Sequence, residues 1–133
     1  MLVVDSSVWI DFFNARPSPG REVLRSLLDQ GEVRIVVPDL VLFEVLRGFR
    51  FERDLRTARA LFAELSIEGA LDPELALEAA EHYRSLRGRG YTVRSPIDVL
   101  LAAFCIDRDY ALLHNDRDFV ALAALRGLRQ WQQ

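Results

Sequence analysis

The chain contains no lysine, so the 17 residues counted as lysine or arginine are all arginines. A Walker-A phosphate loop requires a lysine and Schiff-base catalysis requires an amine, so both are excluded. The single cysteine, Cys105, rules out an internal disulfide and fits a reducing compartment. No apolar run approaches the length of a membrane-spanning helix, and the N-terminus lacks the basic region and cleavage site of a signal peptide. We therefore expect a cytoplasmic protein that does not contact a membrane.

Negative charge is in slight excess, with a formal net charge of −3. This balance disfavours indiscriminate binding to nucleic acids. A local basic face is still compatible with it, because affinity for phosphates depends on where the arginines lie. Arginines gather at residues 47–59 and 84–94. They form either a solvated face that pairs with neighbouring acids or a surface for phosphates, and the pattern alone does not choose between the two.

The pattern of apolar residues predicts one α/β domain over residues 1–133. Half of the residues are hydrophobic, which at this length suffices for a single core. Short apolar runs typical of buried strands occupy residues 2–4, 33–37 and 110–113, with possible edge strands at 66–71 and 126–131. Helical patterns occupy residues 8–14, 21–30, 52–65 and 72–87 and follow Pro38 and Pro96. Because helices connect the strands, we expect the strands to be parallel.

The first helical segment, residues 8–14, has almost no polar side chain besides Asp11. Ser6 or Ser7 is expected to cap its N-terminus. A helix that is apolar all round is buried in a core, or in a core and against a partner. We therefore expect that part of the surface around Trp9, Phe12 and Phe13 contacts another chain.

Two of the predicted strands end in carboxylates. Asp5 directly follows residues 2–4, and Asp116 and Asp118 follow residues 110–113. In a parallel α/β sheet the carboxyl ends of the strands share one edge, where ligands bind. Taken alone, Asp5 is well explained as a turn residue. Its repetition after a second strand favours a shared site.

Two further acids lie in apolar helices. Asp98 follows Ser95-Pro96 and is expected in a first helical turn, where the helix dipole favours negative charge. Glu44 lies within an apolar stripe, where an unpaired carboxylate is costly. Each has an ordinary explanation, as a helix-terminal acid and as an acid that reaches water. Together with the acids at the strand ends, they indicate one carboxylate cluster.

Such a cluster is expected to bind a divalent metal ion. Neighbouring carboxylates repel one another and take up protons unless a cation neutralises them. In the absence of a cysteine and histidine cluster the ligands are all oxygens, which favours Mg²⁺ or Mn²⁺ over structural zinc. Chemistry at such ions is mostly phosphoryl or phosphodiester transfer.

The histidines and the cysteine are weaker candidates. A lone histidine beside a turn, such as His114, is more often hydrogen-bonded than catalytic. His82 lies between acids on a helix and is expected at the surface. Cys105 lies in an apolar helix and is expected to be a buried, inert thiol.

Four stretches in the right order and spacing give the chain its resemblance to a known family. They are Val-Val-Asp-Ser-Ser-Val-Trp-Ile-Asp at residues 3–11, Glu44 in a helix that starts with proline, Ser-Pro-Ile-Asp-Val-Leu-Leu-Ala-Ala at 95–103 and Leu-Leu-His-Asn-Asp-Arg-Asp-Phe at 112–119. Over essentially its whole length the chain resembles the PIN-domain ribonucleases, most closely the VapC-type toxins of bacterial toxin–antitoxin pairs. The resemblance implies a three-layer α/β/α sandwich with a short, mostly parallel central sheet.

The resemblance also assigns roles to individual residues. The four acids of the family correspond to Asp5, Glu44, Asp98 and Asp116. Asp118 resembles an additional family acid that binds metal or supports the site, and Ser6 resembles a hydroxyl residue that contacts water or phosphate. In one common version of the family, an asparagine at the position of Asn115 stands without an acid after it. Here Asp116 is added, and we favour it over Asn115 as the metal ligand because of its charge.

The resemblance implies that the chain is an endoribonuclease dependent on Mg²⁺ or Mn²⁺. It would be the toxin of a type II toxin–antitoxin system and would block translation. The expected partners are the RNA substrate, a cognate antitoxin and a second copy of the chain in a homodimer, which assembles with antitoxin into a heterotetramer or larger complex. Asp5, Asp98, Asp116 and Asp118 are the expected metal ligands. Catalytic roles are expected for Asp5, Glu44, Asp98 and Asp116.

Two other functions were weighed against this one. A phosphatase of the haloacid dehalogenase type needs a second aspartate two residues after the first, where this chain has Ser7, and a lysine, which it lacks. A degenerate PIN-like scaffold would bind without cleaving, but all the acids of the family are present. Metal titration distinguishes the scaffold from the ribonuclease, since a scaffold need not bind Mn²⁺.

Overall fold

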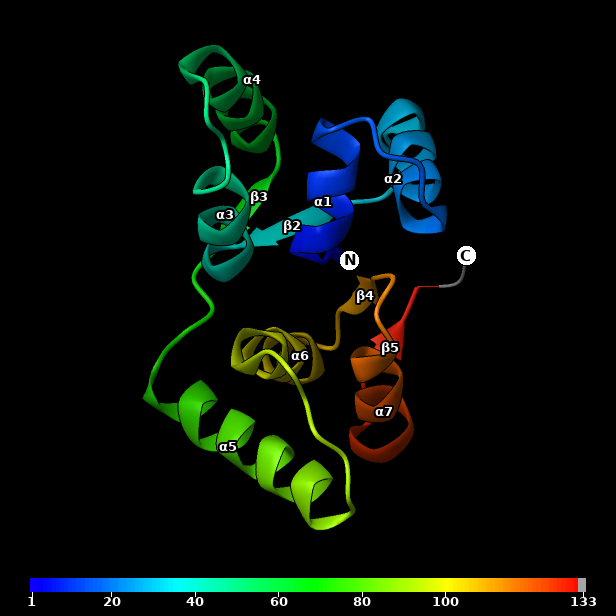
Figure 1. Ribbon diagram of the computed structural model, residues 1–133, viewed down its shortest axis with the longest axis vertical. Helices are drawn as coiled ribbons and strands as arrows, with labels where there is room; N and C mark the ends of the chain where they lie inside the picture. Colours follow the sequence, from blue (N-terminus) through cyan, green and yellow to red (C-terminus); the bar gives the residue numbers. More distant parts are fainter. Residues whose placement is uncertain (132–133) are drawn as a thin grey trace.

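Five parallel strands form one sheet in residues 1–131, the part of the chain that the computed structural model describes (Figure 1). The strands are β1 (Leu2–Val4), β2 (Ile35–Pro38), β3 (Ser66–Glu68), β4 (Ala111–Leu113) and β5 (Arg129–Gln130). Their order across the sheet is β3-β2-β1-β4-β5, and every neighbouring pair is parallel. The last two residues of the expected domain 1–133 lie outside the described residues.

Seven helices connect or flank the strands within the described residues. They are α1 (Ser6–Phe13), α2 (Pro19–Gln30), α3 (Asp39–Leu46), α4 (Glu52–Ala63), α5 (Pro73–Gly88), α6 (Pro96–Arg108) and α7 (Arg117–Arg126). Figure 1 shows α1 and α2 on one side of the sheet and α5, α6 and α7 on the other. The predicted α/β class and parallel sheet are thus confirmed. No helix in the described part of the chain is long and apolar enough to cross a membrane.

The central strands are covered on both faces, which explains their composition. All residues of β1, β2 and β4 are buried. A strand without a solvent face reads as a continuous apolar run. The core beside them includes four large aromatic side chains that are almost fully buried, Trp9, Phe62, Phe104 and Phe119.

The apolar side chains of α1 pack largely inside this chain, which corrects part of the expectation from sequence. Trp9 is completely buried, with its ring centroid 4.9 Å from that of Phe62. Phe13 lies 5.5 Å from Phe49 and 5.7 Å from Phe62, measured between ring centroids. Trp9 therefore cannot contact another chain, whereas Phe12 and Phe13 remain partly exposed.

The prediction that a serine caps α1 is also wrong. Asp5 is the N-cap residue, and its carboxylate accepts a hydrogen bond from the amide of Ser7. Ser6 and Ser7 are the first residues inside the helix. An aspartate caps as well as a serine does, so local preference does not distinguish the two alternatives.

His82 is buried, although its acidic neighbours on α5 predicted a surface position. Its Nδ1 accepts a hydrogen bond of 2.8 Å from Nε of Arg126 on α7, and Arg126 also donates to Ser85. Burial lowers the pKa of His82, and the charge of Arg126 adds to this effect. The tertiary packing of α5 against α7 thus determines the position of this side chain.

Candidate metal centre

The carboxyl ends of β1 and β4 lie side by side and bring the two acidic segments together. Val4 is in register with Leu113, and the amide of Asp5 donates to the Leu113 carbonyl at 2.9 Å. The segment 114–118 leaves β4 at the same edge. This adjacency is the one that the parallel sheet predicts for its strand ends.

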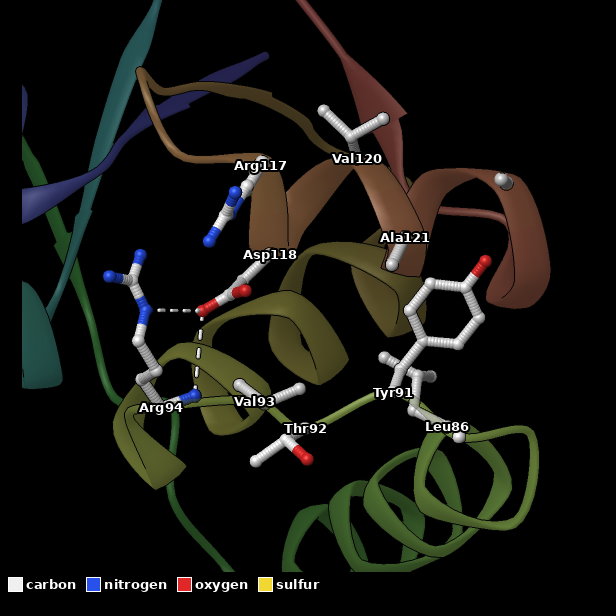
Figure 2. A pocket seen from close by; sticks show the side chains of 11 residues that line it. Leu86, Tyr91, Thr92, Val93, Arg94, Arg117, Asp118, Val120 and Ala121 are labelled. Carbon is white, nitrogen blue, oxygen red and sulfur yellow. Dashed lines mark hydrogen bonds and ion pairs between the residues drawn. The ribbon is translucent and has the colours of Figure 1, made fainter.

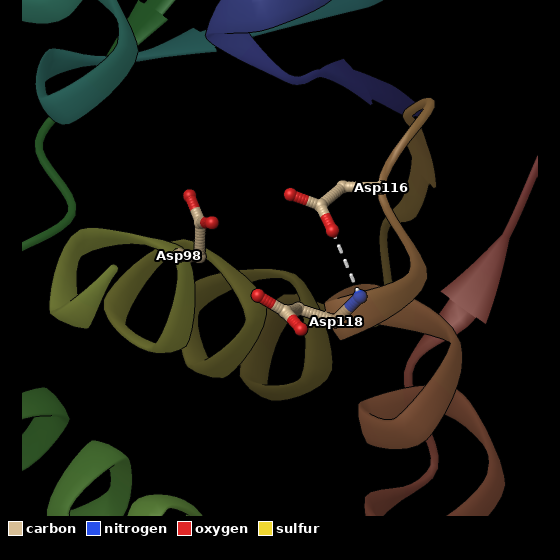
Figure 3. Close-up of side chains that lie close together, drawn as sticks. All are labelled: Asp98, Asp116 and Asp118. Carbon is tan, nitrogen blue, oxygen red and sulfur yellow. Dashed lines mark hydrogen bonds between the residues drawn. The ribbon is translucent and has the colours of Figure 1, made fainter. Parts of the chain in front are cut away.

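Three carboxylates converge at this edge from two helices (Figure 3). Asp98 lies in the first turn of α6, Asp116 is the N-cap residue of α7, and Asp118 lies in the first turn of α7. One oxygen from each lies within 4.8 Å of the other two. Asp116 accepts a hydrogen bond of 2.9 Å from the amide of Asp118, which fixes their relative position.

Asp5 and Glu44 lie outside this group of three, but their charges act on Asp98. The Asp5 side chain is buried, and Oδ2 accepts hydrogen bonds from the amide and the hydroxyl of Ser7. Its Oδ1 is buried and accepts no hydrogen bond from the described residues. Glu44, on α3, accepts a hydrogen bond of 2.9 Å from the hydroxyl of Ser6. The four other predicted acids thus act electrostatically on Asp98, and Glu44 also acts on Asp5.

Burial raises the pKa values of two of these groups, and neighbouring negative charge adds to the effect. Burial raises the pKa of Asp98 to about 7, and the charges of Asp5, Asp116, Glu44 and Asp118 contribute in that order. Burial also raises the pKa of Asp5, with a smaller contribution from Glu44, against the lowering effect of the bonds from Ser7. Such a site gains stability from a cation.

The oxygen donors present fit a hard divalent cation. Buried polar atoms normally have a partner, whereas Asp5 Oδ1 has none among the described residues, and the charge of Asp5 acts on Asp98. Carboxylate oxygens are the donors that Mg²⁺ and Mn²⁺ prefer. The described residues therefore suit an oxygen-ligated metal ion.

Asn115 and His114 shape the segment around the carboxylates through their hydrogen bonds. Asn115 Oδ1 accepts from the amide of Gly20 at 3.0 Å, and its amide nitrogen donates to Ser18 at 3.2 Å. His114 Nδ1 accepts from the amide of Asp116 at 3.1 Å, so the Nε2 that contacts Gln130 at 2.8 Å carries the proton. Their contacts are those of structural residues.

Comparison with known proteins identifies the family of this chain. The PIN domain family matches residues 2–125. The chain belongs to the PIN-domain family. This PIN domain is 31% identical over 132 residues to Ribonuclease VapC11 of Mycobacterium tuberculosis and to VapC ribonuclease Mb1587 of Mycobacterium bovis, covering 97% of this chain and 96% of each relative.

Solved structures share the fold of this PIN domain at lower sequence identity. VapBC2 from Rickettsia felis, bound to a DNA fragment from its promoter, aligns with a TM-score of 0.76 and 16% identity, covering 98% of this chain and 96% of that one. The sarcin-ricin-loop-cleaving toxin VapC20 of M. tuberculosis aligns over 100% of both chains, with a TM-score of 0.71 and 16% identity.

The sequence does not predict the contacts that two side chains of this PIN domain, Ser7 and Arg94, make with the acids. Ser7 holds the Asp5 carboxylate. The Asp-x-Ser spacing is the signal that could have indicated this, because an aspartate commonly bonds to backbone two residues on. Arg94, one of several arginines in the stretch 84–94, lies with its guanidinium 3.5 Å from Asp116 and 3.6 Å from Asp118. Nothing local distinguishes it from its neighbours.

Cys105 and the arginines of residues 47–59 differ in burial. Cys105 is fully buried, and burial raises the pKa of its thiol, so it is inert as predicted. The arginines of 47–59 are all exposed. Both interpretations of that stretch, ion pairing and phosphate binding, stay open.

Proposed function

We propose that this PIN domain is a metal-dependent endoribonuclease that hydrolyses RNA phosphodiester bonds, the toxin of a type II toxin–antitoxin pair that blocks translation. The observation that carries the proposal is the convergence of Asp98, Asp116 and Asp118 beside the buried, partly unpartnered Asp5. The ribonuclease relatives over nearly the whole chain support RNA as the substrate class.

Four carboxylates hold Mg²⁺ or Mn²⁺ in this proposal, namely Asp5, Asp98, Asp116 and Asp118. The bound ion supplies Lewis-acid stabilisation of the phosphate and lowers the pKa of water. Ser7 fixes Oδ2 of Asp5, so that Oδ1 is the oxygen free to bind. The amide of Asp118 likewise fixes Oδ1 of Asp116.

Glu44 orients the attacking water and accepts its proton. Its carboxylate is partly exposed and bonds through one oxygen to Ser6, which leaves the other oxygen for a water molecule. Ser6 is thereby a positioning residue. Asn115 supports the site from behind by joining the segment after β4 to the start of α2.

An antitoxin and a second copy of the chain are the proposed protein partners. Several solved structures with this fold are VapBC complexes, among them VapBC-1 from nontypeable Haemophilus influenzae, which supports an antitoxin partner. The homodimer, and its assembly with antitoxin into a heterotetramer or larger complex, follow from the family resemblance. Sedimentation analysis at micromolar concentration tests the dimer, and a monomer would contradict it. A cytoplasmic location accords with an RNA substrate.

The experiment that tests the function maps RNA ends after incubation of total RNA with purified protein and Mn²⁺. We expect new ends at defined sites, no cleavage in EDTA and none with Asp5→Asn. Hydrolysis of p-nitrophenyl phosphate without RNA cleavage would indicate a phosphatase. The absence of both activities in Mn²⁺ would indicate a degenerate scaffold, and either result contradicts the proposal.

A further inference from the structure

A cavity of about 620 Å³ opens directly beside the carboxylate cluster (Figure 2). It lies between the end of α5, the segment 90–94 and the face of α7 that carries Asp118 and Ala121. Its volume is within the range of small-molecule sites, about 300–1,000 Å³. Asp118 belongs to both the cavity wall and the cluster, so the two are continuous.

The cavity has a charged end and an apolar end. Figure 2 shows Asp118, Arg94 and Arg117 together at one end, with the Arg94 side chain paired to Asp118 at 3.6 Å. At the other end the ring of Tyr91 lies beside Ala121. Tyr91 is 49% exposed, so its ring is accessible from solvent.

We propose that this cavity is the subsite for one nucleotide of the RNA, directly flanking the scissile phosphate. The proposal rests on the proposed ribonuclease function and adds the part of the site that holds the base. A phosphate at the carboxylate cluster places its own nucleotide at the charged end, because both share Asp118. The guanidinium groups of Arg94 and Arg117 favour the anionic backbone there.

The apolar end suits the base of that nucleotide. Unpaired bases of RNA are commonly held by stacking on an aromatic side chain, a contact that every base can make. Tyr91 offers an exposed ring, and the rest of that end is formed by small or aliphatic side chains such as Ala121, Ala124 and Leu86.

The test compares four variants on a random-sequence RNA library cut in Mn²⁺, with all ends sequenced. Tyr91→Ala removes the ring, Tyr91→Phe retains it, and Ala124→Trp fills the cavity from an exposed position on α7. Ala80→Trp is the matched control, an exposed alanine on α5 that does not line the cavity. Thermal melting and Mn²⁺ titration establish that each variant is folded and has an intact cluster.

We expect the wild-type protein to show a modest base preference at one position flanking the cut, set by stacking strength. Tyr91→Ala and Ala124→Trp should flatten that preference and raise KM about tenfold, the loss of one base–aromatic stack, with unchanged Mn²⁺ affinity. Tyr91→Phe and Ala80→Trp should behave as the wild type does.

Unchanged KM and unchanged base preference in both Tyr91→Ala and Ala124→Trp would overturn the subsite. So would variants that cut RNA normally but no longer bind the protein encoded by an adjacent antitoxin gene, since the cavity would then be a peptide site. Failure of the wild-type protein to cut any RNA in Mn²⁺ is a different result, because it removes the proposed ribonuclease function itself.

Discussion

Asp5 combines a structural role with a proposed catalytic one, and the two can be separated. Its Oδ2 caps α1, whereas its Oδ1 has no donor among the described residues. Asparagine caps a helix as well as aspartate does, but it cannot supply the negative charge that a metal ligand needs. A substitution at this position can thus remove one role and keep the other.

We expect Asp5→Asn to lower the rate of RNA cleavage at least about a hundredfold. Its melting temperature should stay within a few degrees of the wild-type value. Asp72→Asn is the control, because Asp72 caps α5 in the same way through a bond of 2.8 Å to the amide of Leu75. Cleavage assays and thermal melts of both variants check this. Wild-type cleavage by Asp5→Asn would refute the assignment of this ligand.

Arg94 occupies the position in which a bound cation would neutralise Asp116 and Asp118. Its guanidinium makes ion pairs of 3.5 and 3.6 Å, and its side chain is 68% exposed. We expect Arg94→Ala to bind Mn²⁺ about two- to fivefold more tightly, because a competing positive charge of surface ion-pair strength is lost. Its cleavage rate should nevertheless fall, because the arginine also contacts the RNA backbone in the proposed subsite.

Isothermal titration with Mn²⁺ measures the affinity. Arg84→Ala is the matched control, since Arg84 makes a surface ion pair of 3.2 Å with Glu81 on α5. Weaker Mn²⁺ binding in Arg94→Ala than in Arg84→Ala would contradict the competition between arginine and metal.

At the scale of elements, the sequence was most informative where one local signal sufficed. Short apolar runs predict the buried strands, and the acids that follow β1 and β4 indicate the edge of the sheet where the strands end. Gly31 ends α2 in the left-handed conformation that favours glycine, as its place after the apolar pattern predicts. The family resemblance, which combined these signals, is confirmed by the match to PIN domains.

Features that depend on packing between distant elements were not predictable. His82 is buried because α7 carries Arg126 opposite it, 44 residues further along the chain. Trp9 belongs to the core because Phe62 of α4 packs on it. Arg94 reaches the carboxylates because the segment before α6 passes the start of α7. The roles of the individual site residues remain predictions.

The close approach of α1, α2 and the segment after β4 makes Gly20 a sensitive position. A Cβ atom there would lie 2.8 Å from Asn115 Oδ1 and 2.9 Å from Val8 Cγ2. We expect Gly20→Ala to destabilise the protein by about 1–3 kcal/mol, because one of these neighbours must move. Urea unfolding measures the change.

Gly88→Ala is the control for this substitution. Gly88 ends α5, and a Cβ atom there would meet no atom within 4 Å. Since alanine is the better helix former, this variant should gain about 0.5–1 kcal/mol. Equal effects of the two substitutions would show that Asn115 does not hold α2 against the acidic segment.

For the whole molecule, repulsion within the carboxylate cluster destabilises the folded state, and a bound metal ion would relieve that repulsion. Because the pKa of Asp98 rises from 3.8 to about 7 on folding, the native state binds this proton more tightly than the unfolded state does. The resulting stability is fully present below pH 3.8 and is lost as the pH rises through about 7. The shift sets an upper limit of about 4 kcal/mol, and solvent around the half-buried group reduces it.

We therefore expect Asp98→Asn to be more stable than the wild-type protein at pH 8 in EDTA, and the two to converge as the pH falls towards 4. Millimolar Mn²⁺ should reverse the order at pH 8, because an ion that binds only the native wild-type protein stabilises it by mass action. Urea unfolding across this pH range, with and without Mn²⁺, measures both effects. Asp107→Asn, at an exposed position on the same helix, should follow the wild-type curve in both conditions. If Mn²⁺ stabilised Asp98→Asn as strongly as the wild-type protein, Asp98 would not be a ligand and the centre of the site would have to lie elsewhere.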